Sequence, residues 1–522
     1  MSHSPIRKME NNERGQLRRS RPKGERSELS ALCGRKAAAI VLLAVALACG
    51  GCAVGPDFKL PPAPAATGLM PQPLPAQTQA TPVAGGAAQH FDPAAELSSQ
   101  WWTAYGSPQL DRLVSEAFTH SPTVASAQAA LRVAQEQVNA QRGGLFPSVG
   151  GSIGVTREKL NGASQGFPGF GNFLFTLYNA SVNLSYNFDV FGGVRRGIEA
   201  QEAGRDAQRE ELQATYQTLA ANVVTTAVLE ASLRAQIDAT KELIASAQHE
   251  VDLGRQEFEL GGAARSDVLS QESNWASVQA TLPPLEQQLA AARSQLAVYL
   301  GKAPSEYAEA PFDLSSLQLP LDIPLMVPSE IVRQRPDIRR AEAQLHEATA
   351  QIGVATANML PQIGLSGSYG DSSSSFRSIF NNNVFSLGAS VSQPLFQGGA
   401  LNAKRRAAIA AYDQALAQYR QTVLLAFKNV ADALRALDAD ARTLAAQYRA
   451  QTAATDSLHL IEQRFGLGGA NHLELLVAQQ QYQRARVAYV QALAARYQDT
   501  AALFLALGGD WKQAAEPVAA QR

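Results

Sequence analysis

The stretch that decides the fold is Ser181-Val182-Asn183-Leu184-Ser185-Tyr186-Asn187-Phe188-Asp189, in which every even position is apolar and every odd position is polar. Side chains of a β-strand point alternately to its two faces, so this pattern predicts a strand with one apolar and one polar face. A second stretch alternates in the same way, with Phe385, Leu387, Ala389 and Val391 set between Ser386, Gly388, Ser390 and Ser392. A membrane barrel and a half-buried strand of a soluble sandwich both give such an alternation.

Two further features favour the membrane barrel. Most of the remaining sequence has a helical pattern and offers no further strands to close a soluble sandwich. The turn segments of the two predicted hairpins, residues 157–172 and 371–383, are long, polar and rich in Gly or Ser, as the outer loops of membrane barrels tend to be. Four strands cannot close a barrel, because the smallest membrane barrels use about 8 strands. We therefore expect several copies of the chain to assemble, which would remove the open sheet edges.

The sequence is internally duplicated. Pro122 and Pro147 bracket a helical stretch, and Pro336 and Pro361 bracket another with the same spacing. Downstream, the segment Phe258-Glu259-Leu260-Gly261-Gly262 has its counterpart in Phe465-Gly466-Leu467-Gly468-Gly469. A period of roughly two hundred residues is far above that of solenoid repeats, so it indicates a duplicated domain.

Two long segments, residues 193–261 and 399–468, contain no proline. At ~1.5 Å per residue, each could run close to 100 Å as one helix. The spacing of Ile237, Thr240, Ile244, Ala247, Val251 and Phe258 is that of a coiled-coil seam, although an ordinary long helical bundle has the same periodicity. The pattern is also helical from Leu110 to Gly144, with Ser121 placed to cap a helix that begins at Pro122.

The amino terminus predicts export. The first 36 residues carry ten Lys or Arg against four Glu, and Ala37 to Ala48 is an unbroken apolar run that suits a signal peptide and falls short of a bilayer span. The run ends in small residues and cysteine, and we expect cleavage before Cys52. Residues 61–95 are rich in Pro, Ala, Gln and Gly, which predicts an extended tether, with order beginning near Trp101-Trp102.

These observations give a predicted division of the chain. It consists of a cleaved signal region (1–51), a tether (52–98), a first structural repeat (99–327, with a β-hairpin at about 147–191), a second repeat (328–510, with a β-hairpin at about 361–396) and a flexible tail (511–522).

Composition excludes several classes of function. Without residues 1–51 the chain keeps 35 basic and 42 acidic residues of the 45 and 46 in the whole sequence, and this mildly acidic balance argues against nucleic-acid binding. The seven histidines are scattered without the i, i+3 or i, i+4 partners of a helical metal site, and no H-E-x-x-H or phosphate-binding loop occurs. We therefore expect neither an enzyme nor a protein with a metal or other cofactor.

Four segments carry a resemblance to a known family. They are residues 52–61, Trp101-Trp102, residues 335–370 and Gln393-Pro394-Leu395-Phe396-Gln397-Gly398-Gly399. Together they resemble the outer-membrane lipoproteins of tripartite efflux systems, the NodT-type branch of the TolC-like outer-membrane factors. The resemblance implies a mixed α and β membrane protein, a homotrimer in which each protomer gives four strands to a β-barrel and long helices to a periplasmic α-helical barrel with an equatorial collar.

The resemblance also implies location, partners and function. Cys52 would be acylated and would anchor the chain in outer-membrane lipid, and this covalent lipid is the only added group expected. The partners would be a periplasmic adaptor and an inner-membrane pump, most often of the RND type, and the function would be passive export of drugs or other small molecules. An outer-membrane duct of a type I polypeptide secretion system is the alternative.

A passive duct needs an end that closes. The glycine pairs Gly261-Gly262 and Gly468-Gly469 are expected to end the two long helices and to form the tips of two helical hairpins. Arg265, Asp267 and His472 come directly after these glycine pairs, and the resemblance implies that Leu473, Glu474 and Val477 line the periplasmic aperture. All six are candidate residues of a periplasmic gate. Val477 departs from many relatives, which have aspartate there, and Glu474 is the candidate substitute. Arg265 and His472 are the nearest donors in sequence that could hold these carboxylates. Alternatively, Asp267 and Glu474 only favour helix amino termini.

Overall fold

The computed structural model describes residues 53–62, 68–70, 74–93, 95, 98–161, 171–308, 310, 312–325, 328–378, 380 and 382–508. The predicted signal region, Cys52 and the tail after residue 510 lie outside the described residues. Within them the chain divides into two compact units. The sheet unit comprises Gly151–Gly192 and Gln362–Val391, and the helical unit comprises Val54–Gly150, Gly193–Pro361 and the chain from Ser392 onward. Each unit thus takes residues from both copies of the duplication, so neither copy is a compact unit by itself.

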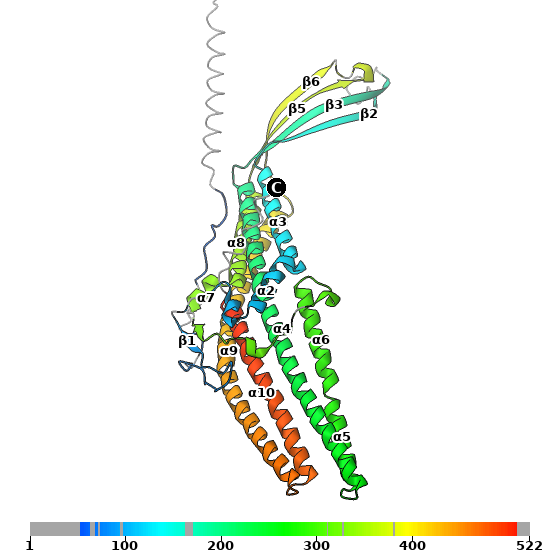
Figure 1. Cartoon of the computed structure of the whole chain (residues 1–522). Coiled ribbons are helices and arrows are strands. Elements are labelled where there is room, and N and C mark those ends of the chain that lie inside the picture. Colours follow the sequence, from blue (N-terminus) through cyan, green and yellow to red (C-terminus); the bar gives the residue numbers. More distant parts are fainter. Residues whose placement is uncertain are drawn as a thin grey trace, which may run out of the picture. The chain divides into compact units, whose positions relative to one another are not determined.

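The sheet unit is built on four strands in the order β2-β3-β5-β6 (Figure 1). Their bounds are β2 Ser148–Asn161, β3 Asn172–Phe188, β5 Gln362–Ser373 and β6 Asn383–Ser392, with a short helix η5 (Phe376–Ser378) before β6. Each copy of the duplication supplies two neighbouring strands, as the alternating pattern predicts. The two copies join through an antiparallel pairing of β3 with β5.

The register of β3 on β5 separates apolar from polar side chains. Leu184 lies opposite Gly367, and Tyr186 lies opposite Leu365, whereas Asn183 lies opposite Ser368. Polar contacts then run across the strands, with the Ser152 and Ser181 hydroxyls 2.9 Å apart and those of Ser368 and Ser386 2.8 Å apart. Because side chains alternate across a strand, one face of the sheet is apolar and the other carries this row of hydroxyls and amides.

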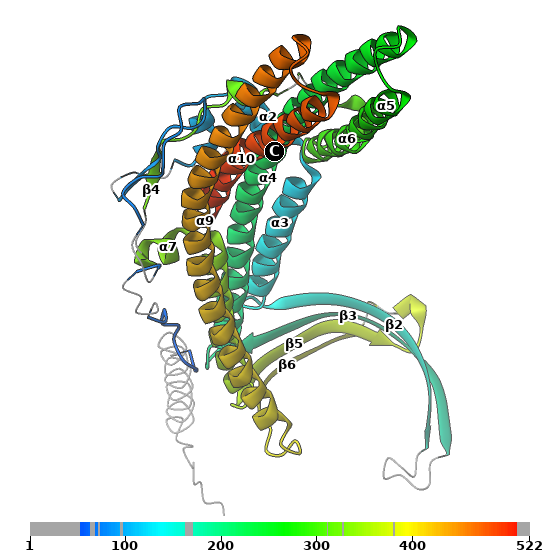
Figure 2. The same ribbon diagram turned by 90° about the horizontal axis from the view of Figure 1, so that it is seen from below.

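The helical unit is dominated by two helices of equal length, α4 (Gly193–Glu259) and α9 (Ala400–Gly466), each of 67 residues. In Figure 1 and Figure 2, α9 runs beside α10 (His472–Leu507), and α4 runs beside α5 (Arg265–Gln279) and α6 (Leu282–Tyr299). The predicted seam on α4 is buried at Ile237, Thr240, Ala247 and Val251, whereas Phe258 is exposed near the helix end. No helix in the described part of the chain has both the length and the apolar character needed to cross a membrane.

The two copies differ in the return helix. The second copy uses one continuous helix, α10, whereas the first uses α5 and α6, which are separated at Ala280 and Thr281. Pro283 and Pro284 follow the break, where they lie in the first turn of α6 and need no helical hydrogen-bond donor.

The helices that precede the hairpins are α2 (Pro108–His120) and α3 (Pro122–Gly143) in the first copy, and α7 (Pro328–Gln334) and α8 (Pro336–Ala357) in the second. Pro122 begins a helix as expected, but the side chain of Ser121 makes no capping hydrogen bond, so that part of the prediction is wrong. Ser121 is buried at the junction of α2 and α3. It is also the residue that ends α2, where its backbone N–H donates to the Ala117 carbonyl. The serine that caps is Ser107, whose hydroxyl accepts from the N–H of Leu110.

The expectation of an unpacked tether up to residue 98 is also wrong for residues 74–93. Strand β1 (His90–Asp92) pairs in parallel with β4 (Asp322–Pro324), and Gln89 is fully buried. The Gln89 amide donates to the Pro320 carbonyl at 3.0 Å and to the Thr500 hydroxyl at 3.1 Å. Residues 74–93 therefore form a packed strap against the helical unit.

A buried arginine holds this strap. Arg496 of α10 is fully buried, and its guanidinium donates to the Ala87 carbonyl at 2.6 Å, to the Thr78 hydroxyl at 3.0 Å and to the Gly85 carbonyl at 3.3 Å. Aromatic side chains fill the neighbouring core, which includes Trp101 of the short helix η1 (Trp101–Tyr105). Two further short helices in the described part of the chain are η3 (Pro304–Glu306) and η4 (Leu314–Ser316).

Candidate functional site

The turn between α4 and α5 and the turn between α9 and α10 lie at the same end of the helical unit, as Figure 1 and Figure 2 both show. The two turns have the same geometry. Gly261 and Gly468 take positive φ values of 77° and 71°, which favour glycine because it has no Cβ. The N–H of Gly262 donates to the Glu257 carbonyl, and that of Gly469 to the Arg464 carbonyl, both at 2.7 Å. This is the Schellman ending of a helix, and it is found at both tips.

His472, the first residue of α10, contacts the other three helices of the tip. Its Nδ1 lies 2.5 Å from the Gln271 amide nitrogen of α5, and its Nε2 lies 3.4 Å from the Glu257 carboxylate of α4. Its ring packs edge-on against Phe465 of α9, with centroids 4.6 Å apart. Because an amide nitrogen only donates, Nδ1 accepts and Nε2 carries the proton that points toward Glu257. His472 is therefore a link between helices at the tip.

Glu474 is held by residues of its own hairpin. Its N–H donates to the Asn471 side-chain oxygen at 2.9 Å, and the Asn471 amide donates back to the Glu474 carboxylate at 3.0 Å, which is a reciprocal helix cap. The Arg464 guanidinium lies 3.6 Å from the same carboxylate and also donates to the Gly469 carbonyl at 2.6 Å. Within one protomer, Arg464 is the basic residue that the α9–α10 turn brings close to Glu474, and the expectation that Arg265 or His472 holds this carboxylate in the assembly stays a prediction.

The first-copy residues are arranged more simply. Asp267 lies in the first turn of α5, where the Ser266 hydroxyl donates to its carboxylate at 3.3 Å. The Arg265 side chain is exposed and makes no hydrogen bond or ion pair within the described residues. This arrangement fits the alternative in which Asp267 stabilises a helix amino terminus.

Apolar side chains are exposed around these charges. Leu473 and Val477 are four residues apart on α10, so they share one face, and they are 66% and 44% exposed. The turn residues Leu260 and Leu467 are each 88% exposed. A soluble monomer rarely leaves such a group of apolar side chains at one end, which indicates a contact surface.

An ion pair near the first tip turn links the two arms of the first hairpin, α4 and α5. Arg255 of α4 pairs with Glu272 of α5 at 2.6 Å. Further from the tip on α4, burial raises the pKa of the Glu250 carboxyl above its ordinary value. The described residues contain no group of three or more His, Cys, Asp or Glu side chains placed to bind a metal ion.

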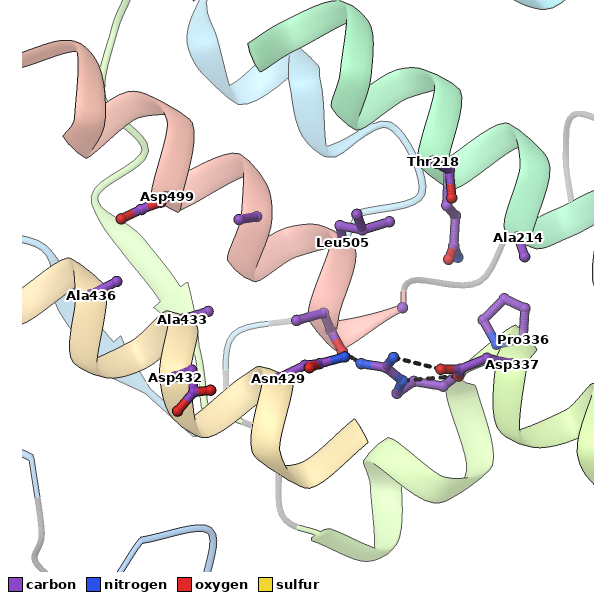
Figure 3. Close-up of a pocket in the computed structure, with 15 residues that line it drawn as sticks. Ala214, Thr218, Pro336, Asp337, Asn429, Asp432, Ala433, Ala436, Asp499 and Leu505 are labelled. Atoms are coloured by element: carbon purple, nitrogen blue, oxygen red, sulfur yellow. Dashed lines mark hydrogen bonds and ion pairs between the residues drawn. The ribbon is translucent and has the colours of Figure 1, made fainter. Parts of the chain in front are cut away.

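A separate pocket of about 530 Å³ lies between α4, α8, α9 and α10 (Figure 3). Two of its charged lining residues, Arg335 and Asp432, form ion pairs. Arg335 pairs with Asp337 at 2.6 Å and also donates to the Ala506 carbonyl at the end of α10, and Asp432 pairs with Lys428 at 2.6 Å. The Arg335 side chain therefore links the start of α8 to the end of α10.

Comparison with known proteins places this geometry in a family. The family described as outer membrane efflux protein matches residues 113–302 and 327–509. The chain belongs to the outer membrane efflux protein family. Its fold is that of the outer-membrane channels, and it is the outer-membrane channel component of an efflux system.

Relatives and solved structures agree with this assignment. The pyoverdine export outer membrane protein OpmQ of Pseudomonas aeruginosa is 31% identical over 79% of this chain and 88% of its own length. The nodulation protein T of Rhizobium leguminosarum bv. trifolii is 26% identical over 89% and 96%. The solved outer-membrane channel OprN matches with a TM-score of 0.76 and 28% identity, covering 88% of this chain and all of that one.

Proposed function

We propose that this efflux channel works as a lipid-anchored homotrimer whose helical tips form a closable periplasmic end. The observation that carries the proposal is the four-stranded sheet with β2 and β6 at its two edges. A sheet with two open edges is unstable in lipid, and four strands are too few for closure, whereas three copies would supply twelve. Chemical crosslinking and native mass spectrometry in mild detergent test the trimer, and a stable monomer would contradict it.

The anchor is proposed at Cys52. Removal of residues 1–51 leaves it as the first residue and the only cysteine of the chain. Radioactive palmitate should label the wild-type protein and leave the Cys52→Ala variant unlabelled. Both proteins should still insert into the outer membrane, because the strands supply most of the buried apolar area. No metal or further cofactor and no enzymatic activity enter the proposal.

The proposed partners are a periplasmic adaptor and an inner-membrane pump of the RND type. The exposed Leu260 and Leu467 support this, since each hairpin tip offers one apolar side chain in the same Schellman turn. Replacing both with Asp should abolish adaptor co-purification and efflux while the isolated trimer keeps its thermal stability. Unchanged co-purification with the adaptor would place its binding surface elsewhere.

The proposed substrates are drugs or other small molecules. Polypeptide secretion is the alternative, because a duct of this kind has no need to recognise its cargo. A deletion strain complemented with the wild-type gene should regain drug tolerance, and restoration of secretion of a polypeptide without drug tolerance would favour the alternative.

A further inference from the structure

A small cavity lies near the tip turns, between α4, α5 and α10. Its volume is about 20 Å³, which holds about one water molecule. Eight residues line it: Ala247, Glu250, Gln271, Asn274, His472, Leu475, Leu476 and Gln479. The cavity is thus mixed in character, with apolar walls and several polar groups.

Three polar atoms of this lining have no hydrogen-bond partner among the described residues. They are the Glu250 Oε2, the Gln271 Oε1 and the Gln479 Nε2 atoms. Gln271 and Gln479 are only 9% and 3% exposed, so bulk water does not solvate them. Leaving a buried donor or acceptor without a partner costs about 1–3 kcal/mol per group.

The chemistry of these atoms selects the ligand. A carboxylate oxygen and an amide oxygen accept hydrogen bonds, and the amide nitrogen of Gln479 donates one. The nitrogen of the Gln271 amide contacts His472, and its oxygen lies beside Gly254 of α4, where it has no hydrogen-bond donor among the described residues. A cation would attract the two oxygens but would be repelled by the amide hydrogens of Gln479.

We propose that this cavity binds one water molecule that donates to Glu250 and Gln271 and accepts from Gln479. The site takes one group from each of α4, α5 and α10, so the bound water connects the two arms of the first hairpin to the return helix of the second. This water would add to the direct contacts of His472 of α10 with Gln271 of α5 and Glu257 of α4. The proposal concerns cohesion of the helical unit and does not depend on the gate.

The first test is a structure of the full-length protein at a resolution that shows ordered water. The expected result is a density peak at about 2.7–3.2 Å from the Glu250, Gln271 and Gln479 atoms, the range of a hydrogen bond. Empty density in a well-ordered tip would overturn the proposal. A peak at about 2.3–2.6 Å from the oxygens, with the Gln479 amide turned away, would also overturn it, because that spacing is typical of a cation such as Ca²⁺.

The second test uses Gln479→Met, which keeps a side chain of similar length and removes the donor. Hydrogen–deuterium exchange of the trimer in detergent should then be faster by about fivefold in residues 245–275 and 472–480, the scale of one lost buried hydrogen bond. Gln481→Met is the matched control, because Gln481 lies two residues away on the same helix and is exposed. Equal exchange in the two variants would contradict a water-mediated link.

Discussion

The guanidinium of Arg464, the third residue from the end of α9, lies 3.6 Å from the carboxylate of Glu474, the third residue of α10. The same guanidinium donates to the Gly469 carbonyl, so one side chain bridges the whole α9–α10 turn. The tip that carries the candidate gate is therefore braced by an ion pair within one hairpin of one protomer.

Arg464→Ala should loosen this turn without opening it fully. The two side chains are 57% and 41% exposed, and exposed ion pairs typically contribute under about 1 kcal/mol. The open probability in planar bilayers should rise by no more than about fivefold. Arg442→Ala is the control, because Arg442 pairs with Asp438 on the same helix away from the tip. An identical effect of both variants would mean that the Arg464 pair has no special role in the tip.

The sheet should respond to charge on one face only. Leu184 and Ser185 are neighbours on β3 and point to opposite faces, with Leu184 on the face shared with Tyr186. An arginine on a lipid-facing position near the bilayer midplane costs ~2–4 kcal/mol, whereas a lumen-facing position tolerates it. Leu184→Arg should therefore lower the amount of assembled protein in outer-membrane fractions far more than Ser185→Arg. Equal amounts would refute the proposal that the apolar face contacts lipid.

Much of this architecture could be predicted from the sequence, for a physical reason. Alternating apolar residues in β3 and β6 and the proline-free stretches of α4 and α9 are local signals, and local sequence sets strand and helix geometry. The pairing of β3 with β5 is a contact between the two copies, and no local pattern specifies it. The strap was missed because its stability comes from Arg496, which lies about four hundred residues further along the chain.

The candidate site was predicted less well than the fold. The repeated glycine pair predicted where the two long helices end, because a helix often ends at a glycine with positive φ. Gly261 and Gly468 both have positive φ values. The partner of Glu474 was missed, although Arg464 stands immediately before the turn motif. A basic residue in the last turn of a helix often contacts the carbonyls of its own helix end, and this rule would have pointed to Arg464.

The strap should depend on Arg496. Arg496→Met would remove the donor to the carbonyls of Ala87 and Gly85, while the Thr78 hydroxyl would keep the N–H of Gln89 as a donor, and the expected cost is about 1–3 kcal/mol. Limited proteolysis should then cleave within residues 74–93 at protease concentrations that leave the wild type intact. Arg484→Met is the control, since Arg484 is exposed on the same helix. Cleavage of both variants at the same rate would show that Arg496 does not hold the strap.

The stability of the helical unit should fall as pH rises toward neutrality. Burial, followed by the neighbouring Asp499, raises the pKa of Asp440 from 3.8 to about 7, so the folded protein keeps a proton that the unfolded chain releases near pH 4. Because the folded state binds more protons in this window, the free energy of unfolding decreases between about pH 4 and pH 7.

Asp440→Asn should remove most of this pH dependence, because asparagine does not titrate. The measurement is the Tm of the detergent-solubilised protein at pH 5 and pH 8, compared with Asp413→Asn, whose aspartate is exposed on the same helix. A difference in Tm between the two pH values that is as large in Asp440→Asn as in the wild type would assign the pH dependence to other groups.

Single-channel recording in planar bilayers tests the proposed tip gate most directly. The double variant Arg464→Ala, Leu473→Ala removes the brace of the turn and an exposed apolar side chain next to Glu474. If the helical tips form the constriction, the purified wild type gives discrete low-conductance channels, and the double variant gives a higher conductance and sensitises cells to vancomycin. A correctly assembled double variant with the conductance of the wild type would contradict a constriction at the tips.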